Sequence, residues 1–326
     1  MRARVARWWR AAGLILPGLL VARGAGAQLI GKLAPSYNPD DPYQVPDAPA
    51  PPSLPDLTHR GVSLGLTSAL GRITPLPRSD GTHPEAVGVW LHRVSAEVAV
   101  ANRRWYLGIS ELIAGGRDPE GRSTTVVASN PEIWGRALWA SRAGLAYGGG
   151  LGFLPPLVRH DADSAKAAVQ ANVRLVRPWD FPQFADRTMT FRPFIDVRSL
   201  DRSVMLQLRQ GLDLTMLTSE VSATRTPDTD LTSRTTFYIG YRPAERLGLG
   251  LELSEVYFIK APGVEDGQRA VFSISPSVRW MGEVLQPAAS LLVPVGKPLF
   301  HQARDYWAIQ LGLEVIVDPN PSRALW

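Results

Sequence analysis

The stretch Ser203–Met216, SVMLQLRQGLDLTM, alternates between apolar and polar residues over its fourteen positions and decides the fold. Apolar side chains take one parity, broken only by Gln210: Val204, Leu206, Leu208, Leu212, Leu214 and Met216. The other parity carries Met205, Gln207, Arg209, Gly211, Asp213 and Thr215. Because successive side chains of a strand point to opposite faces, the pattern predicts a strand with one apolar and one charged face. At roughly 3.3 Å per residue, such a strand crosses a bilayer at a tilt.

Similar runs alternate with turns from His59 to the C-terminal region. They predict an all-β fold, an up-and-down antiparallel transmembrane β-barrel of about twelve strands. We expect these strands at 60–70, 86–100, 103–113, 135–148, 166–178, 188–198, 203–216, 232–242, 246–258, 268–280, 284–295 and 305–317. The strand at 166–178 is indicated by an alternation of Val169, Ala171, Val173 and Leu175 with polar residues.

The connections between these strands alternate between short and long, as turns and outer loops of a membrane barrel do. The long polar ones are 71–85, 114–134, 179–187, 217–231, 259–267 and 296–304. One connection, 149–165, is long where a short turn is due. It indicates either an error in the strand count or a periplasmic extension.

The strand at 86–100 changes parity within its length. Val87, Val89 and Leu91 share one parity, whereas Val94 and the apolar residues after it share the other. A β-bulge inserts one residue into a strand and reverses the facing of the residues beyond it. We therefore expect a bulge near His92 and Arg93.

The N-terminal residues 1–27 have the features of a cleaved signal peptide. Arginines precede an apolar stretch at 11–22, and Ala25-Gly26-Ala27 provides an A-x-A cleavage site. Residues 28–58 form a proline-rich segment, predicted to be a periplasmic leader that either stays extended, docks on a partner or threads the lumen. The barrel is then expected over 59–326, in the outer membrane of a Gram-negative cell.

Composition excludes several classes of protein. Five of the 35 basic residues lie in the signal, which leaves 30 basic against 30 acidic residues and no support for nucleic-acid binding. The chain has no cysteine, so disulfides, thiolate metal sites and a lipidated cysteine are excluded. No other apolar run approaches the length of a transmembrane helix. A soluble β-sandwich is the remaining alternative to the barrel, and extraction from envelopes by salt alone would support it.

The C-terminal part of the chain resembles a known group. The motifs are Ser275–Trp280 (SPSVRW), Leu285–Ala288 (LQPA), Val293–Gly296 (VPVG) and Tyr306–Gly312 (YWAIQLG). They are similar to the closing hairpins of Gram-negative outer-membrane barrels, most of all to transporters of the phenol-degradation MetA-pathway family. The resemblance covers about the last 130 residues and implies a channel or uptake barrel, without catalytic residues. The expected final strand ends near Val317, whereas the aromatic residue that usually ends such a strand is here Trp326.

The polar parity of the strands supplies the candidate site. We expect the lumen to be lined by Arg142, Arg174, Arg192, Arg209, Asp213, Arg242, Glu252, Arg279 and Glu314, together with Glu97 and Asp196. These charges either pair and plug the barrel or leave a path that screens solutes. The strand number allows both, because barrels of about eight strands are filled by side chains and barrels of about sixteen to eighteen strands hold a water channel. Their near balance predicts no strong ion selectivity.

Other chemistry has little support in the sequence. His92 and Ser95 are the one close His/Ser pair and would serve an outer-membrane phospholipase-like hydrolase, but a spacing of three separates their faces unless the bulge intervenes. The five histidines show no metal-ligand spacing. The glycine-rich run Gly148–Gly152 lacks the lysine of a phosphate-binding loop and is typical of a turn. Asp161 and Asp163 could contact calcium but are typical of a solvated loop. We predict no cofactor and no metal.

The leading hypothesis is a passive channel for small solutes, with outer-membrane lipids and the barrel-assembly machinery as partners. The alternatives are the hydrolase and a closed barrel that serves as a structural or adhesive platform. The sequence does not fix the solute or the oligomeric state.

Overall fold

The computed structural model describes residues 51, 61–76, 81, 85–100, 105–117, 124–140, 145–159, 165–200, 203–218, 229–244, 246–260, 269–282, 284–295 and 303–317. The predicted signal peptide, the leader apart from Pro51, and Trp326 lie outside these residues. So do Arg142, Asp161, Asp163 and every histidine except His92.

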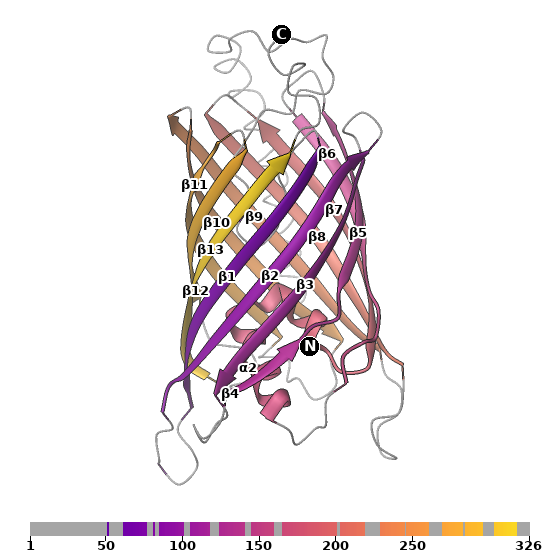
Figure 1. The fold of residues 1–326 in the computed structure, drawn as a ribbon, viewed down its shortest axis with the longest axis vertical. Helices are drawn as coiled ribbons and strands as arrows, with labels where there is room; N and C mark the ends of the chain where they lie inside the picture. Colours follow the sequence, from indigo (N-terminus) through magenta and orange to yellow (C-terminus); the bar gives the residue numbers. More distant parts are fainter. Residues whose placement is uncertain are drawn as a thin grey trace, which may run out of the picture. The chain divides into compact units, whose positions relative to one another are not determined.

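Thirteen antiparallel strands make up one sheet (Figure 1). They are β1 (Val62–Pro75), β2 (Val87–Val100), β3 (Trp105–Arg117), β4 (Thr124–Ala128), β5 (Glu132–Ala140), β6 (Leu145–Leu154), β7 (Thr188–Leu200), β8 (Val204–Leu217), β9 (Thr229–Ala244), β10 (Leu247–Lys260), β11 (Ala270–Trp280), β12 (Leu285–Val295) and β13 (Ala303–Val317).

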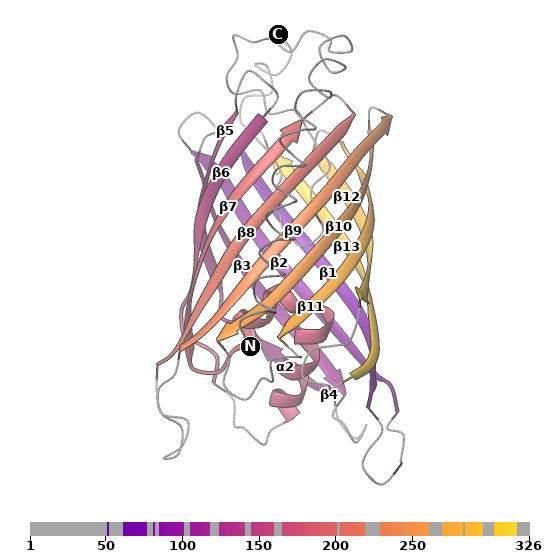
Figure 2. The ribbon, with the colours of Figure 1, turned by 180° about the vertical axis from the view of Figure 1, so that it is seen from behind.

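The sheet closes on itself. β1 pairs with β2 on one side and with β13 on the other, and β2 pairs with β3, so the ring has no free edge there. β4 and β5 pair with successive parts of β3 and occupy one strand position between them. The structure is therefore a twelve-position antiparallel barrel, which confirms the predicted fold class (Figures 1 and 2).

The alternation of β8 has the predicted orientation. Met205, Gln207, Arg209, Asp213 and Thr215 are buried inside the barrel. The opposite parity is exposed on the outside, including Val204, Leu208, Leu212 and Leu214. The neighbouring strands repeat this arrangement, and apolar side chains form an outer surface suited to lipid.

This surface gives a first prediction. Leu208 lies on the outward face of β8 and is 37% exposed. A charged residue on the lipid face is destabilising, by about 2–4 kcal/mol for arginine at the bilayer midplane. We therefore expect Leu208→Arg to lower the free energy of unfolding measured in lipid vesicles by roughly that amount. The control is Leu157→Arg, at an exposed site outside the strands, and equal losses in both variants would contradict a lipid-facing β8.

Two of the predicted strands are wrong. Residues 166–178 form the helix α2 (Ala165–Val176) and the start of a 3-10 helix, η1 (Pro178–Phe184). The predicted strand 135–148 is instead two antiparallel strands, β5 and β6, joined at 141–144. The two errors cancel in the number of barrel positions and account for the irregular connection at 149–165, while the thirteenth strand, β4, lies in the predicted connection 114–134.

With these strands corrected, the connections alternate throughout. Those at 101–104, 141–144, 201–203, 245–246 and 281–284 are short. Apart from the three-residue link 129–131 between β4 and β5, which share one strand position, the others are longer, and the longest, 155–187, contains α2 and η1. Figures 1 and 2 both show these helices inside the end of the barrel that carries the long connections.

The predicted bulge in β2 is also wrong. β2 pairs with β1 and β3 in continuous register through His92 and Arg93. Val89 and Leu91 face inward like Arg93, because α2 and η1 bring an apolar surface against this part of the wall. The inward face changes from apolar to charged along the strand, and its parity does not change.

Candidate functional site: the occupied lumen

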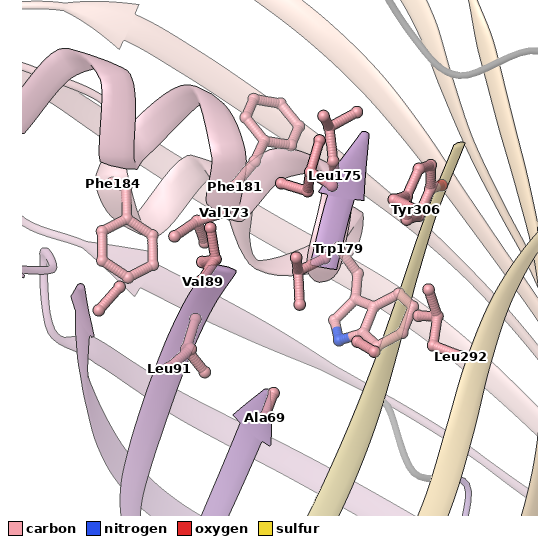
Figure 3. Packing of buried hydrophobic residues seen from close by; sticks show 14 of the residues in the cluster. Ala69, Val89, Leu91, Val173, Leu175, Trp179, Phe181, Phe184, Leu292 and Tyr306 are labelled. Atoms are coloured by element: carbon pink, nitrogen blue, oxygen red, sulfur yellow. The ribbon is translucent and has the colours of Figure 1, made fainter. Parts of the chain in front are cut away.

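The segment α2–η1 packs against an apolar ring of the barrel wall. Val169, Val173 and Val176 lie on one face of α2 at helical spacing and are fully buried. They belong to a cluster that includes Leu91, Leu112, Leu292 and Tyr306 from four strands (Figure 3). The wall accommodates them closely: a Cβ added at Gly71 would lie 2.5 Å from Val176 Cγ2.

All seven residues of η1 are buried. Trp179, Phe181 and Phe184 continue the apolar contacts of α2 (Figure 3). The Phe181 ring lies 5.2 Å from that of Phe258 on β10, a favourable tilted aromatic contact. We refer to Ala165–Phe184 as the plug.

Polar contacts attach the plug to the wall. Arg177 pairs with Asp180 inside the plug, and its Nη1 donates to Gln310 Oε1 on β13 at 3.0 Å. Arg192 Nη2 on β7 donates to the Trp179 carbonyl at 2.6 Å. Burial alone would raise the pKa of Asp180, but Arg177, Arg93 and Arg192 outweigh it and hold that pKa below its ordinary value. The plug therefore carries a carboxylate held by arginines.

Asn130, between β4 and β5, forms hydrogen bonds to the chain on both sides of the plug. Its Oδ1 accepts hydrogen bonds from the backbone N–H groups of Leu157 at 2.8 Å and Val158 at 2.7 Å. Its Nδ2 donates to the Ala185 carbonyl at 3.0 Å, and its own N–H donates to Gln183. Asn130 is fully buried, in the link between β4 and β5, so these hydrogen bonds are shielded from solvent.

Asn130 gives a second prediction. Asn130→Ala leaves the buried N–H of Val158 and the buried carbonyl of Ala185 without their partner, at about 1–3 kcal/mol for each group, and removes the partly buried bond to Leu157. We expect faster protease cleavage within 155–187 while the rest of the barrel stays resistant. Asn172→Ala on α2 is the matched control. Equal cleavage of the two variants would show that Asn130 does not hold the segment.

Ion pairs fill the middle of the lumen. Glu97 accepts from Arg136 at 2.6 Å and from Trp134 Nε1 at 2.9 Å. The Arg136 guanidinium also lies 4.0 Å from the Tyr106 ring centroid, a cation–π contact.

Three further carboxylates are each shared between arginines. Asp196 accepts from Arg198 at 2.7 Å and Arg209 at 2.6 Å. Asp213 accepts from Arg192 Nε at 3.1 Å and Arg234 Nε at 2.8 Å. Glu132 lies 3.0 Å from Arg192 and 3.9 Å from Arg93. Around these three carboxylates, arginines therefore outnumber acidic residues.

The structure places most of the predicted lumen residues on the inward face. Arg192, Arg209, Asp213 and Glu252 are buried there. Arg242, Arg279 and Glu314 take the inward parity and are half-buried, and Ser63 donates to Glu314. Arg174 belongs to α2 and not to a strand, and Arg142 is outside the described residues.

Sequence reasoning missed Arg93, Glu132, Arg136, Arg177, Asp180 and Arg234. Arg93 shares parity with Glu97 on β2, a signal that the expected bulge concealed. Arg136 and Glu132 were hidden by the misplaced strand at 135–148. Arg177 and Asp180 carried no strand pattern, because they belong to the plug.

The cavities that these groups line are small. One of about 50 Å³ is bordered by the plug and by several strands of the wall. Its lining consists of Arg93, Glu132, Trp134, Arg136, Trp179, Asp180, Arg192, Phe194, Arg209 and Arg234. Two more, of about 10 and 30 Å³, lie against Trp179 and against Arg177. Each has room for one or a few water molecules at most.

The His/Ser pair considered for a hydrolase does not come together. His92 faces outward and is exposed, whereas Ser95 is buried on the inward face. His92 Nδ1 instead lies 2.9 Å from Ser68 Oγ on the outer surface. The described part of the chain contains no cluster of three metal-ligating side chains. Among the same residues, no helix has the length and apolarity needed to cross a membrane.

A closed antiparallel barrel with an apolar exterior, a charged interior and an inward-folded segment is a transmembrane β-barrel fold. The chain is similar to the solved structure of an outer membrane channel from Pseudomonas putida F1, with a TM-score of 0.55 and 11% identity over 86% of this chain and 100% of that one.

A weaker match is the KdgM porin, with a TM-score of 0.43 and 9% identity over 78% of this chain and 99% of that one. Another is a Pseudomonas aeruginosa FadL homologue, with a TM-score of 0.40 and 10% identity over 80% of this chain and 90% of that one. No family model and no curated protein matches the chain.

Proposed function

We propose that this protein is an outer-membrane channel through which small solutes pass by diffusion, without energy coupling. The observation that carries the proposal is that a segment of one connection, the plug, packs inside one end of a barrel whose inward wall is largely polar (Figure 1). A barrel kept only for stability has no need of a charged interior, because buried ion pairs contribute little net stability.

The outer surface and the resemblance of the sequence support the same function. Apolar residues such as Leu208, Leu251 and Leu311 face outward on separate strands, as contact with outer-membrane lipid requires. The predicted signal peptide would deliver the chain to that membrane. The similarity of the closing hairpins to transporters of the MetA-pathway family supports solute uptake.

We further propose that the structure is a closed state and that the plug moves when solutes pass. The plug is held by apolar packing and by polar contacts of Arg177, Asp180, the Trp179 carbonyl and Gln183. Segments that lack strand partners open more readily than the paired strands of a sheet, and they supply the moving parts of proteins. The wall strands, paired on both sides, would stay fixed.

Liposome swelling tests the channel. The purified mature chain, folded in detergent and inserted into liposomes, is exposed to neutral sugars of graded size. We expect swelling with a sharp size cutoff, because the intermediate strand number limits the lumen. Liposomes without protein provide the control.

A second candidate function is the closed platform, favoured by the filled lumen itself. The swelling assay separates the two. Protein that is folded and inserted, yet passes no sugar even after the plug has been replaced, would support the platform and contradict the channel.

A further inference from the structure

The 50 Å³ cavity beside the plug has a strongly cationic lining. Five arginines border it and only two carboxylates, Glu132 and Asp180. The remaining carboxylates that pair with these arginines stand behind the lining, and Asp213 is shared between Arg192 and Arg234. Together with Glu97, Asp196 and Asp213 behind it, the five arginines face five carboxylates, so the excess of positive charge is confined to the lining itself.

Arg93 has a long contact with the carboxylate nearest to it. Its Nη2 lies 3.9 Å from Glu132, which Arg192 contacts at 3.0 Å. The same Nη2 donates to Ser110 Oγ at 3.2 Å, a neutral partner. Arg93 is only 6% exposed, so this positive charge is removed from solvent, with Glu132 at the limit of an ion pair and Asp180 as the other carboxylate that acts on it.

Two buried donors at the cavity have no acceptor among the residues that the structure describes. They are Nε of Arg93 and Nε1 of Trp179. Both side chains line the cavity, one from β2 and one from the plug, and the Trp179 indole nitrogen is visible in Figure 3. Buried donors are normally hydrogen-bonded, so these two are suited to a ligand that accepts.

We propose that this cavity binds a small carboxylate anion, held by Arg93 and the indole N–H of Trp179. A guanidinium presents planar paired donors that match the two oxygens of a carboxylate. The volume fits a group of the size of a few water molecules. Resting on the proposed channel function, the site makes small carboxylates the preferred solute class.

Because Trp179 belongs to the plug and Arg93 to the wall, the anion would join the two. Binding would then stabilise the plugged barrel, since a ligand that binds only the folded state raises its stability.

The test measures binding separately from transport. Thermal unfolding of the detergent-folded full chain is followed by tryptophan fluorescence in sodium acetate and in sodium chloride at equal ionic strength. We expect a saturable rise in Tm with acetate and a smaller one with chloride. Arg93→Gln should weaken the apparent acetate affinity by roughly tenfold or more.

Two further variants keep the test decisive. Arg93→Lys keeps the charge but loses the planar fork, so it should bind acetate more weakly than the wild type even if Arg93→Gln does not fold. Arg269→Gln, outside the cavity lining, should bind as the wild type does. Equal effects of acetate and chloride, or unchanged affinity in both Arg93 variants, would overturn the proposal.

The failures of the two proposals are distinguishable. Acetate binding without swelling by any solute would leave the anion site intact and remove the channel. Swelling by neutral sugars without acetate binding would leave the channel and remove the anion site.

Discussion

Replacing residues 159–184 by a short glycine–serine linker is expected to raise solute flux through the barrel by roughly an order of magnitude. Twelve strands enclose an interior wider than side chains alone fill, so removal of the plug widens the path for solutes. The replacement is geometrically simple. The ends of the removed segment already lie together, since Arg187 N donates to the Val158 carbonyl at 2.9 Å and Asn130 binds both sides. The wall strands keep all their pairing partners.

Flux is measured by liposome swelling and by conductance across planar bilayers. The control is a shortening of the separate connection between β8 and β9, at 219–227, which leaves the plug sequence intact. An unchanged flux after removal of the plug, in protein shown to be folded, would mean that the wall charges alone close the lumen.

The second large effect is expected from Asp213→Asn. Asp213 is fully buried and its Oδ1 accepts from Arg192 and Arg234. Asparagine keeps the shape but removes the negative charge that these two buried guanidiniums share. Breaking a buried ion pair in this way costs about 3–5 kcal/mol, so the free energy of unfolding should fall by roughly that amount.

Denaturant unfolding in detergent or lipid measures the effect. Asp305→Asn, at an exposed position, should change stability by less than about 1 kcal/mol. Adding Arg234→Gln to Asp213→Asn should recover part of the loss. A full loss that this second change does not relieve would show that Asp213 acts through its shape or its other neighbours.

The barrel was predictable because its strands have faces of opposite chemistry. The alternation of Ser203–Met216 indicated both the strand and its orientation, and β8 confirms it. The same rule failed at Val169 and Val173. These residues are four apart, a spacing that fits both an alternating strand and one face of a helix. This face of the plug is apolar because it packs against the barrel wall, and that contact joins residues far apart in the sequence, so no local pattern reveals it.

The interior charges were predictable only in part. Arg209 and Asp213 follow from the parity of their strand. The partners of Asp213 on β7 and β9, and the role of Glu132, depend on the register between strands and on a correct set of strands. Arg93 shows the limit most clearly: the apolar residues before it face the plug, so its inward orientation required knowledge of the plug itself.

The central claim, that the plug moves to let solutes through the lumen, is tested most directly by one cysteine. The chain has none, so Val173→Cys, on the buried face of α2, gives a unique reactive group. Conductance is recorded before and after a bulky, membrane-impermeant thiol reagent is added. We predict slow reaction during plug opening and a lasting rise in conductance, because the labelled helix no longer fits its seat. Complete labelling of the folded barrel with unchanged conductance, or solute flux through a barrel whose cysteine never reacts, would contradict the account.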